Sequence, residues 1–312
     1  MAGRARASAS APASIGNVGV GFDVLGLAFD AARDRVIAVR EPAPGVRLGD
    51  VSGLVDTLPD TPETNTALAA AQALLAAVDA DFGVRLSIDK GVPLSAGMGG
   101  SAASAVAAAA AVNALLPEPL ATGDLLPFAL AGERISSDPP PWDNVVAALH
   151  GGLVLVAREA PGHVQRLPAP AGIVSLLFHP PVQIETRAAR GVLAAEVPMR
   201  IAVEHSRRLA AFVAGCTTGD AALIRAGLED LLVEPQRAHL LPALAPVKAA
   251  ALGAGALGCS FSGSGPSVFA WALEHDADAV ARAMDAAFRA EGLTATACRA
   301  PVESGGVRLE PA

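Results

Sequence analysis

The chain has 312 residues, of which 52% are hydrophobic and 17% are charged, so it can bury a sizeable core. This balance excludes a disordered or fibrous chain, and at roughly 100–200 residues per domain the length predicts two domains. The net charge of −8 argues against a surface that wraps nucleic acid, because neutralising many phosphates needs a basic face. A small anion is still allowed, since a few backbone N–H groups can hold it.

The sequence shows no convincing targeting, membrane or disulfide signal. Residues Met1–Gly16 lack the roughly 7–15-residue apolar stretch of a signal peptide. The most membrane-like run, Ala102–Leu116, is shorter than the ~20 residues of a bilayer span and is mostly alanine. We therefore expect a buried helix there and a cytoplasmic protein. The odd set of three cysteines, Cys216, Cys259 and Cys298, is interpreted as small core residues.

Hydrophobic periodicity and turn residues predict a mixture of strands and helices in the first half of the chain. In chain order we expect a buried strand at Arg35–Arg40, a helix at Asn65–Val78, a half-buried strand at Val84–Asp89, a helix at Ala102–Leu116, a helix at Asp143–His150 and a strand at Leu153–Ala157.

A Pro/Gly-rich stretch at Ala160–Gly172 is predicted to be a surface connection, and it divides the chain into domains 1–160 and 161–312. Beyond it we expect a strand at Ile173–Phe178, four helical stretches between Arg187 and Ala254, strands at Gly258–Ser262 and Ser267–Leu273, a helix at Asp276–Arg289 and a strand near Thr294–Arg299. Because strands and helices do not alternate strictly, the fold class is α+β in both domains.

The strongest chemical signal is the glycine-rich segment Pro93–Ser104, which runs directly into the alanine-rich helix. Gly97 and Gly99 permit left-handed turns that point successive N–H groups into one concavity, and a helix start adds its unpaired N–H groups and positive dipole end. The segment therefore predicts a phosphate-binding loop, although a plain turn before an N-cap serine would look similar.

Two other glycine-rich segments carry weaker signals. Gly253–Gly258 fits the letters of a dinucleotide fingerprint, but it lies between a helix and a strand, the reverse of the order that such a site needs. It is interpreted as a helix end and turn. Ser262–Ser267 lies between two strands and could be a simple hairpin turn. A Walker loop and a protein-kinase catalytic loop are both missing, and the chain has only two lysines, Lys90 and Lys248.

Taken together, three segments resemble the motifs of the GHMP family of small-molecule kinases. Pro93–Ala102 is similar to the second motif, with Met98 in place of leucine, and Ser262–Ser267 is similar to the third. Ala11–Gly26 resembles the first motif in the form carried by homoserine-specific members of the family. The resemblance covers nearly the whole chain. It implies transfer of the γ-phosphoryl group of ATP to the hydroxyl of L-homoserine, a step of threonine biosynthesis that gives O-phospho-L-homoserine.

The resemblance also implies an architecture and a set of ligands. The N-terminal domain is expected to be like ribosomal protein S5 domain 2 and the C-terminal domain to be ferredoxin-like, with the site between them. ATP and Mg²⁺ are the expected co-substrate and metal, and a homodimer is common in the family. No nucleic-acid or membrane partner is expected.

Family roles carry onto matching positions of this sequence. The implied ATP-binding residues are Asn65, Pro93, Gly97, Met98, Gly99, Gly100, Ser101, Ala102 and Ala103, and the implied metal ligands are Ser101 and Glu133. The implied substrate-binding residues are Asp23, Thr186, Arg190 and Arg237, with Asn17 and Asn144 as catalytic residues.

The chemistry of homoserine agrees with this set, because a zwitterion with a hydroxyl needs an anion, a cation and a polar group. Asp23 can meet the ammonium, Arg190 and Arg237 can meet the carboxylate through paired N–H donors, and Asn17 or Asn144 can hold the hydroxyl. Each charge taken singly also fits a solvated surface residue. Because phosphoryl transfer runs through a loose transition state, we expect that no side chain acts as a general base.

Two positions depart from the family pattern. Gly100 stands where a second serine is frequent, so Ser101 would supply the loop hydroxyl alone. Pro141 stands where homoserine-specific members often have histidine, and the run Pro139–Pro141 stiffens the loop before Asp143. The alternatives left open by the sequence are another small alcohol as acceptor, a non-catalytic metabolite-binding protein and, more weakly, a dehydrogenase that uses Gly253–Gly258.

Overall fold

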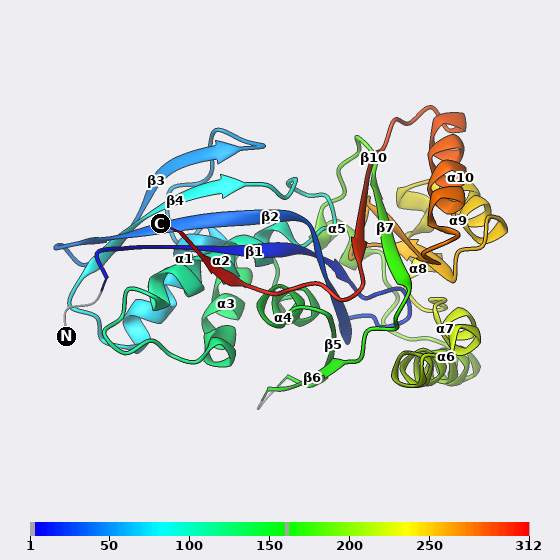
Figure 1. The fold of residues 1–312 in the computed structure, drawn as a ribbon, viewed down its shortest axis with the longest axis horizontal. Coiled ribbons are helices and arrows are strands. Elements are labelled where there is room, and N and C mark those ends of the chain that lie inside the picture. Colours follow the sequence, from blue (N-terminus) through cyan, green and yellow to red (C-terminus); the bar gives the residue numbers. More distant parts are fainter. Residues whose placement is uncertain (1–3, 160–161, 312) are drawn as a thin grey trace.

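The computed structural model describes residues 4–159 and 162–311. In this part of the chain the strands form two separate sheets, one of seven strands and one of four (Figure 1). The larger sheet has the order β11-β1-β2-β4-β3, with β5 and β6 attached beside β2, and the smaller has the order β10-β7-β9-β8. Only the β3–β4 pair in these ranges is parallel. The predicted α+β class with two parts is confirmed.

The larger sheet is built around two long neighbouring strands. Its members are β1 (Arg6–Gly16), β2 (Leu25–Glu41), β3 (Gly45–Gly53), β4 (Gly83–Lys90), β5 (Leu153–Arg158), β6 (His163–Leu167) and β11 (Arg308–Glu310). Every residue of β1 after Arg6 is buried, and the strand is almost entirely small residues. Pro12 lies at a β-bulge between β1 and β2, a position where the missing N–H of proline is tolerated.

Four helices lie together on one side of the long strands (Figure 1). They are α1 (Thr66–Ala77), α2 (Gly100–Asn113), α3 (Leu126–Glu133) and α4 (Trp142–His150), and a 3₁₀ turn at Thr122–Leu125 precedes α3. From Ala102 to Asn113 every residue of α2 is buried, because this helix packs on β1 and β2 and is itself covered by α1, α3 and α4. A helix that is apolar on all sides is stable only at such a central position.

The smaller sheet carries the second group of helices. Its strands are β7 (Ile173–His179), β8 (Gly258–Phe261), β9 (Val268–Leu273) and β10 (Thr296–Pro301). The helices are α5 (Thr186–Gly191), α6 (Met199–Thr218), α7 (Ala221–Gly227), α8 (Glu234–Arg237), α9 (Leu244–Gly253) and α10 (Ala277–Ala290), with a 3₁₀ turn at Ala238–Leu240. The ring of Phe212 in α6 packs at a tilt of 45° against Trp271 of β9, and Phe178 of β7 stacks on Phe288 of α10.

Most predicted elements are confirmed with shifts of up to three residues at their ends. The helices predicted in the first half correspond to α1, α2 and α4, and the predicted strands to β4, β5, β7, β8, β9 and β10. The strand predicted at Arg35–Arg40 is only one end of the much longer β2, and it is half-buried and alternating rather than buried. The described residues between 187 and 254 contain five α-helices rather than four, because the single turn α8 stands apart.

The predicted surface connection at Ala160–Gly172 was wrong over part of its length. Residues 160 and 161 lie outside the described residues, but β6 at His163–Leu167 pairs with β5 and so extends the larger sheet. The chain also returns to that sheet at its far end, where β11 pairs with β1. A boundary between domains 1–160 and 161–312 therefore stays a proposal.

Cys216 and Cys259 are buried core residues, as predicted, and Cys298 is half-buried. Among the described residues, no helix has both the length and the apolar character that crossing a membrane requires.

Candidate active site

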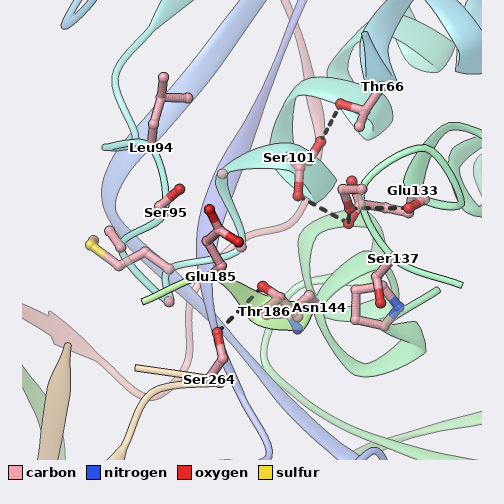
Figure 2. A pocket seen from close by; sticks show the side chains of 18 of the residues that line it. Thr66, Leu94, Ser95, Ser101, Glu133, Ser137, Asn144, Glu185, Thr186 and Ser264 are labelled. Atoms are coloured by element: carbon pink, nitrogen blue, oxygen red, sulfur yellow. Dashed lines mark hydrogen bonds between the residues drawn. The ribbon is translucent and has the colours of Figure 1, made fainter. Parts of the chain in front are cut away.

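A cleft of about 530 Å³ opens between the two sheets and gathers residues from distant parts of the chain. Its walls come from the turn after β1, the start of α1, the loop between β4 and α2, the starts of α4 and α5, and the turn between β8 and β9. Figure 2 shows side chains from several of these segments around the cleft, among them Ser101, Glu133, Asn144 and Thr186. The predicted residues that line it are Asn17, Asp23, Asn65, Pro93, Gly97, Met98, Gly99, Gly100, Ser101, Glu133, Asn144, Thr186, Arg190 and Arg237.

The loop Pro93–Ser101 has the left-handed backbone that was predicted for it. Ser95, Gly97 and Gly99 have φ values of 52°, 71° and 63°, and α2 begins immediately afterwards at Gly100. No side chain caps the N-terminus of α2, so its first N–H groups are available to a ligand in the cleft. The arrangement suits a phosphate group, which favours the positive end of a helix.

The glycines of this loop are also required by protein packing. A Cβ on Gly97 would lie 2.5 Å from the carbonyl oxygens of Ser262 and Gly265, and a Cβ on Gly99 would overlap the Ser14 hydroxyl. The Ser262 hydroxyl donates a hydrogen bond to the Gly97 carbonyl at 2.6 Å. The turn between β8 and β9 is therefore more than a hairpin connection, because it fixes the backbone of the loop.

Three residues predicted to contact ATP have other surroundings. The side chains of Ala102 and Ala103 are buried in α2 and do not line the cleft. Asn65 lines it, but its amide also caps α1: Oδ1 accepts hydrogen bonds from the backbone N–H groups of Ala67 and Leu68, and Nδ2 donates to the Pro59 carbonyl at 2.8 Å. Asn65 thereby holds the loop before α1 against the helix.

Ser101 and Glu133 point toward one another across the cleft floor (Figure 2). The Ser101 hydroxyl donates to Glu133 Oε2 at 3.0 Å, and Ser136 donates to the same oxygen at 3.3 Å. Oε1 of Glu133 is buried and has no partner among the described residues. Burial raises the pKa of the Glu133 carboxyl from 4.5 to about 7, and the hydrogen bonds from Ser101 and Ser136 oppose that rise.

This pair fits a magnesium ion. Mg²⁺ is usually held by one or two carboxylates together with substrate phosphates and retained waters. An unpartnered buried carboxylate oxygen, such as Oε1 of Glu133, would be a suitable ligand for it. In the described ranges no group of three or more His, Cys, Asp or Glu side chains could hold a metal by itself. The ion would therefore depend on the phosphates of the nucleotide.

A buried ion pair beneath the loop was missed from the sequence. The Lys90 ammonium is 2% exposed and donates to Asp34, to the Ser104 hydroxyl at 2.9 Å and to the Gly100 carbonyl at 3.0 Å. Asp34 in turn accepts the backbone N–H groups of Gly91 and Val92. One signal was available, since Lys90 is one of only two lysines and lies three positions before Pro93, where the glycine-rich loop begins.

Asp23 and Arg190, assigned to opposite charges of the substrate, are paired with each other. The two guanidinium nitrogens Nη1 and Nη2 of Arg190 donate to the Asp23 carboxylate at 2.8 and 2.9 Å. Arg237 is 3% exposed, and it donates through Nε to the Ala189 carbonyl at 2.8 Å and through Nη1 to the Gly263 carbonyl at 3.3 Å. Its donor fork is therefore only partly free.

Phe22 is a further residue that sequence reasoning missed. The guanidinium carbons of Arg190 and Arg237 lie 5.4 and 5.3 Å from the centre of its ring. Desolvation lowers the pKa of Arg237, and the nearby Arg190 adds to that shift. Phe22 thus holds both guanidinium groups at the cleft wall, although Arg190 is paired there with Asp23.

The remaining predicted residues lie where the first motif meets α4 and α5. The Asn17 side chain donates through Nδ2 to the Gly263 carbonyl and accepts the Asp23 N–H through Oδ1. Asn144 lies at the start of α4, where its Oδ1 accepts the Ser14 hydroxyl at 2.9 Å. Thr186 is exposed in the cleft with its hydroxyl 3.4 Å from that of Ser264 (Figure 2).

The two sequence departures also lie at the cleft. Gly100 lines the cleft beside Ser101, so the loop has one hydroxyl there. Pro141 lines it as the residue that precedes α4. The Gly253–Gly258 segment, in contrast, joins the end of α9 to β8, which confirms its interpretation as a helix end and turn.

Comparisons with known proteins give the same picture over nearly the whole chain. The family described as GHMP kinases N terminal domain matches residues 65–152, and the family described as GHMP kinases C terminal matches residues 209–290. A protein of Xanthomonas campestris pv. campestris (strain B100) named homoserine kinase is 46% identical over 308 residues, covering 98% of this chain and 95% of the relative. The homoserine kinase of Xylella fastidiosa (strain 9a5c) is 46% identical over 305 residues, covering 97% and 94%.

Solved structures agree with this similarity. The crystal structure of homoserine kinase from Cytophaga hutchinsonii matches with a TM-score of 0.94 and 37% identity, and the match covers 98% of each chain. The crystal structure of L. major mevalonate kinase in complex with R-mevalonate matches with a TM-score of 0.67 and 16% identity, and the match covers 97% of this chain and 98% of the other. The second likeness concerns the fold alone.

Proposed function

The chain belongs to the GHMP kinase family and groups with its homoserine kinases, and from this premise we propose how its cleft transfers the γ-phosphoryl group of ATP to L-homoserine. The protein is a kinase that acts on the homoserine hydroxyl and gives O-phospho-L-homoserine. The single observation that supports the residue assignments best is the meeting of a phosphate loop, a buried carboxylate and two arginines in one cleft. Which residues bind each ligand is our proposal.

We assign the nucleotide phosphates to the loop Gly97–Ser101 and the start of α2. The open N–H groups and the helix dipole supply a preformed anion site there. Ser101 and Glu133 would hold Mg²⁺, which when bound neutralises charge on the β- and γ-phosphates. Because a nearby cation favours the ionised form, Glu133 is expected to be a carboxylate in the loaded enzyme despite its raised pKa of about 7.

Substrate recognition would proceed by exchange of charge partners. Homoserine carries an ammonium that can take Asp23 and a carboxylate that can take Arg190 and a free donor of Arg237. A ligand with both charges compensates both members of the Asp23–Arg190 pair, whereas a ligand with one charge leaves the other member without a partner. The two side chains are 34% and 28% exposed, and a bound ligand covers them further, so a charge left without a partner beneath it is costly and the exchange favours a zwitterion.

The chemistry needs no strong base in this site. Of the four acidic residues that line the cleft in the described ranges, three are already engaged: Asp23 by Arg190, Asp143 by two N–H donors, and Glu133 by hydroxyls at the metal position. The fourth, Glu185, is exposed. We therefore propose that Asn17 or Asn144 holds the hydroxyl in line with the γ-phosphorus. The new O–P bond forms as the bond to the β-phosphate oxygen breaks, and the proton leaves to the transferred phosphoryl group or to water.

A coupled assay of ADP release with a panel of alcohols tests this function. We expect release that depends on L-homoserine and on Mg²⁺. Release with a different alcohol and not with homoserine would replace the acceptor, and ATP binding without release for any acceptor would identify a non-catalytic binding protein. The expected homodimer stays a prediction, which sedimentation of the purified protein can check.

A further inference from the structure

Asp143, in the first turn of α4, connects the two asparagines of the site. Its carboxylate is 1% exposed. Oδ2 accepts the backbone N–H of Asn17 at 2.8 Å, and Oδ1 accepts Nδ2 of Asn144 at 3.1 Å. A carboxylate can only accept hydrogen bonds, so it obliges the Asn144 amide to present its nitrogen on this side and its oxygen on the other.

The Asn17 contact secures an unusual stretch of backbone. Asn17, Val18 and Gly19 have φ values of 66°, 43° and 68°, so three consecutive residues are left-handed and one of them is β-branched. Such backbone persists only where its surroundings determine it. The Asn17 amide also accepts the Asp23 N–H at 3.0 Å, so the same turn places the carboxylate assigned to the substrate ammonium.

The carboxylate has little freedom to move. A Cβ on Gly16 would lie 2.8 Å from Asp143 Oδ2, which shows how closely the end of β1 packs on it. The Asn144 amide is held from its other end by the Ser14 hydroxyl at 2.9 Å. Ser14, Asn144, Asp143 and Asn17 thus form one chain of hydrogen bonds from β1 through α4 to the first motif.

We infer that Asp143 is a positioning residue that orients Asn17 and Asn144 toward the acceptor hydroxyl, an inference that rests on the proposed transfer to homoserine. Both carboxylate oxygens already accept N–H groups, so Asp143 acts through its neighbours and not as the base. Since a small misplacement of a reacting group is costly, the loss of this orientation should lower turnover more than binding.

The Asp143→Asn substitution keeps the shape of the side chain but replaces one of its two acceptor oxygens by an NH₂ group. That group then faces the N–H of Asn17 or of Asn144, so two donors meet. We expect kcat with homoserine to fall on the order of 10²-fold, with the KM for ATP unchanged. Asp220→Asn is the matched control, because Asp220 caps the N-terminus of α7 far from the cleft and asparagine is an equally good cap. Native turnover in Asp143→Asn would overturn the inference.

A double-mutant cycle with Asn144→Ala separates positioning from a general structural role. If Asp143 acts through Asn144, the loss caused by Asp143→Asn should shrink on the order of tenfold in the Asn144→Ala background. An undiminished loss there, or a parallel rise in the KM for ATP, would show a merely structural residue. The unsubstituted enzyme is assayed with homoserine first, so failure of the proposed function would appear before any variant is compared.

The pH profile gives an independent readout. Burial raises the pKa of the Asp143 carboxyl to about 6, and the nearby Asp23 raises it further, while the hydrogen bonds from Asn17 and Asn144 and the charge of Arg190 oppose the rise. Glu133 and Arg237 are the other charged groups coupled to it. Protonation turns an acceptor into a donor, so kcat should fall below about pH 6, and Asp143→Asn should lack that fall. An unchanged profile in the variant would contradict the inference, because the fall would then belong to another group.

Discussion

The role of Glu133 follows from its surroundings in the fold and not from its position in the sequence. Its position at the end of α3 also fits a solvated surface carboxylate, and the resemblance alone marked it as a metal ligand. The structure buries it to 1% exposure and leaves one oxygen without a partner in the described residues. Burial depends on how α1, α2 and α3 pack together, which no local pattern encodes.

Replacing Glu133 by glutamine should remove the metal ligand and keep the shape. Losing one electrostatic contact to a developing charge typically costs ~10²–10³ in kcat, and we expect that loss at saturating Mg²⁺. Steady-state assays over a range of Mg²⁺ concentration measure it. Glu274→Gln, at an exposed carboxylate of the smaller sheet's rim, is the control. Near-native turnover in Glu133→Gln would remove Glu133 from the metal site.

The same substitution should stabilise the free protein at high pH. Because the folded-state pKa of Glu133 lies above its value of 4.5 in model compounds, the folded chain binds this proton more tightly than the unfolded chain. The stabilising contribution of this proton to the free energy of unfolding is therefore fully present below about pH 4.5, and it is lost as pH rises through about 7. Urea unfolding at pH 5 and pH 8 should show Glu133→Gln gaining on the order of 1–3 kcal/mol over the parent between the two. Equal differences at both pH values would contradict a raised pKa.

At the scale of elements, the sequence predicted helices and apolar strands better than strands of small residues. The alanine-rich α2 and the apolar β7 and β9 were recognisable from composition. The strand β1 was not, because its alternating alanine, serine and proline carry little β-propensity and its stability comes from burial between β2, β11 and α2. The sequence identified the glycines of the phosphate loop, but it did not identify the neighbouring atoms that leave no room for a side chain there.

Those neighbours make a specific prediction for Gly99. Gly99→Ala should strain a left-handed residue and press on the Ser14 hydroxyl, which lowers stability by about 1–3 kcal/mol and weakens ATP binding at least tenfold. Gly253→Ala is the control, because a Cβ placed there would meet no atom within 4 Å beyond its chain neighbours and the backbone of its own helix. Thermal melts and calorimetric titration with ATP measure both effects. Unchanged ATP affinity in Gly99→Ala would mean that the loop only joins β4 to α2.

At the scale of the whole molecule, the cleft exists because the third motif docks on the other two. In the turn between β8 and β9, the Gly263 carbonyl accepts hydrogen bonds from the Asn17 and Arg237 side chains. The Ser262 hydroxyl of the same turn donates to the Gly97 carbonyl. Motif resemblance predicted that these segments meet in one site. It could not predict Lys90, Phe22 or Asp143, since each is defined by contacts with residues distant in the sequence.

Substitution of Arg237 tests whether the contact between the third motif and the other two also determines which substrate binds. Arg237 donates hydrogen bonds to backbone carbonyls of α5 and of the β8–β9 turn, and it lines the cleft together with Arg190. Lysine cannot reproduce that planar fork, and a hydrogen bond to a charged group is worth ~1.5–3 kcal/mol. Arg237→Lys should therefore raise the KM for homoserine roughly 10- to 150-fold while the KM for ATP barely moves.

Arg225→Lys is the control for this prediction, because Arg225 also donates to a backbone carbonyl, that of Ala256, but lies outside the cleft. It should leave both KM values unchanged. Binding of 3-aminopropan-1-ol, which lacks the carboxylate, should be equally weak in the parent and in Arg237→Lys, since the group that Arg237 recognises is missing. If instead the constants for ATP and homoserine rise together in Arg237→Lys, the guanidinium holds α5 and the β8–β9 turn in place, and the substrate carboxylate binds Arg190 alone.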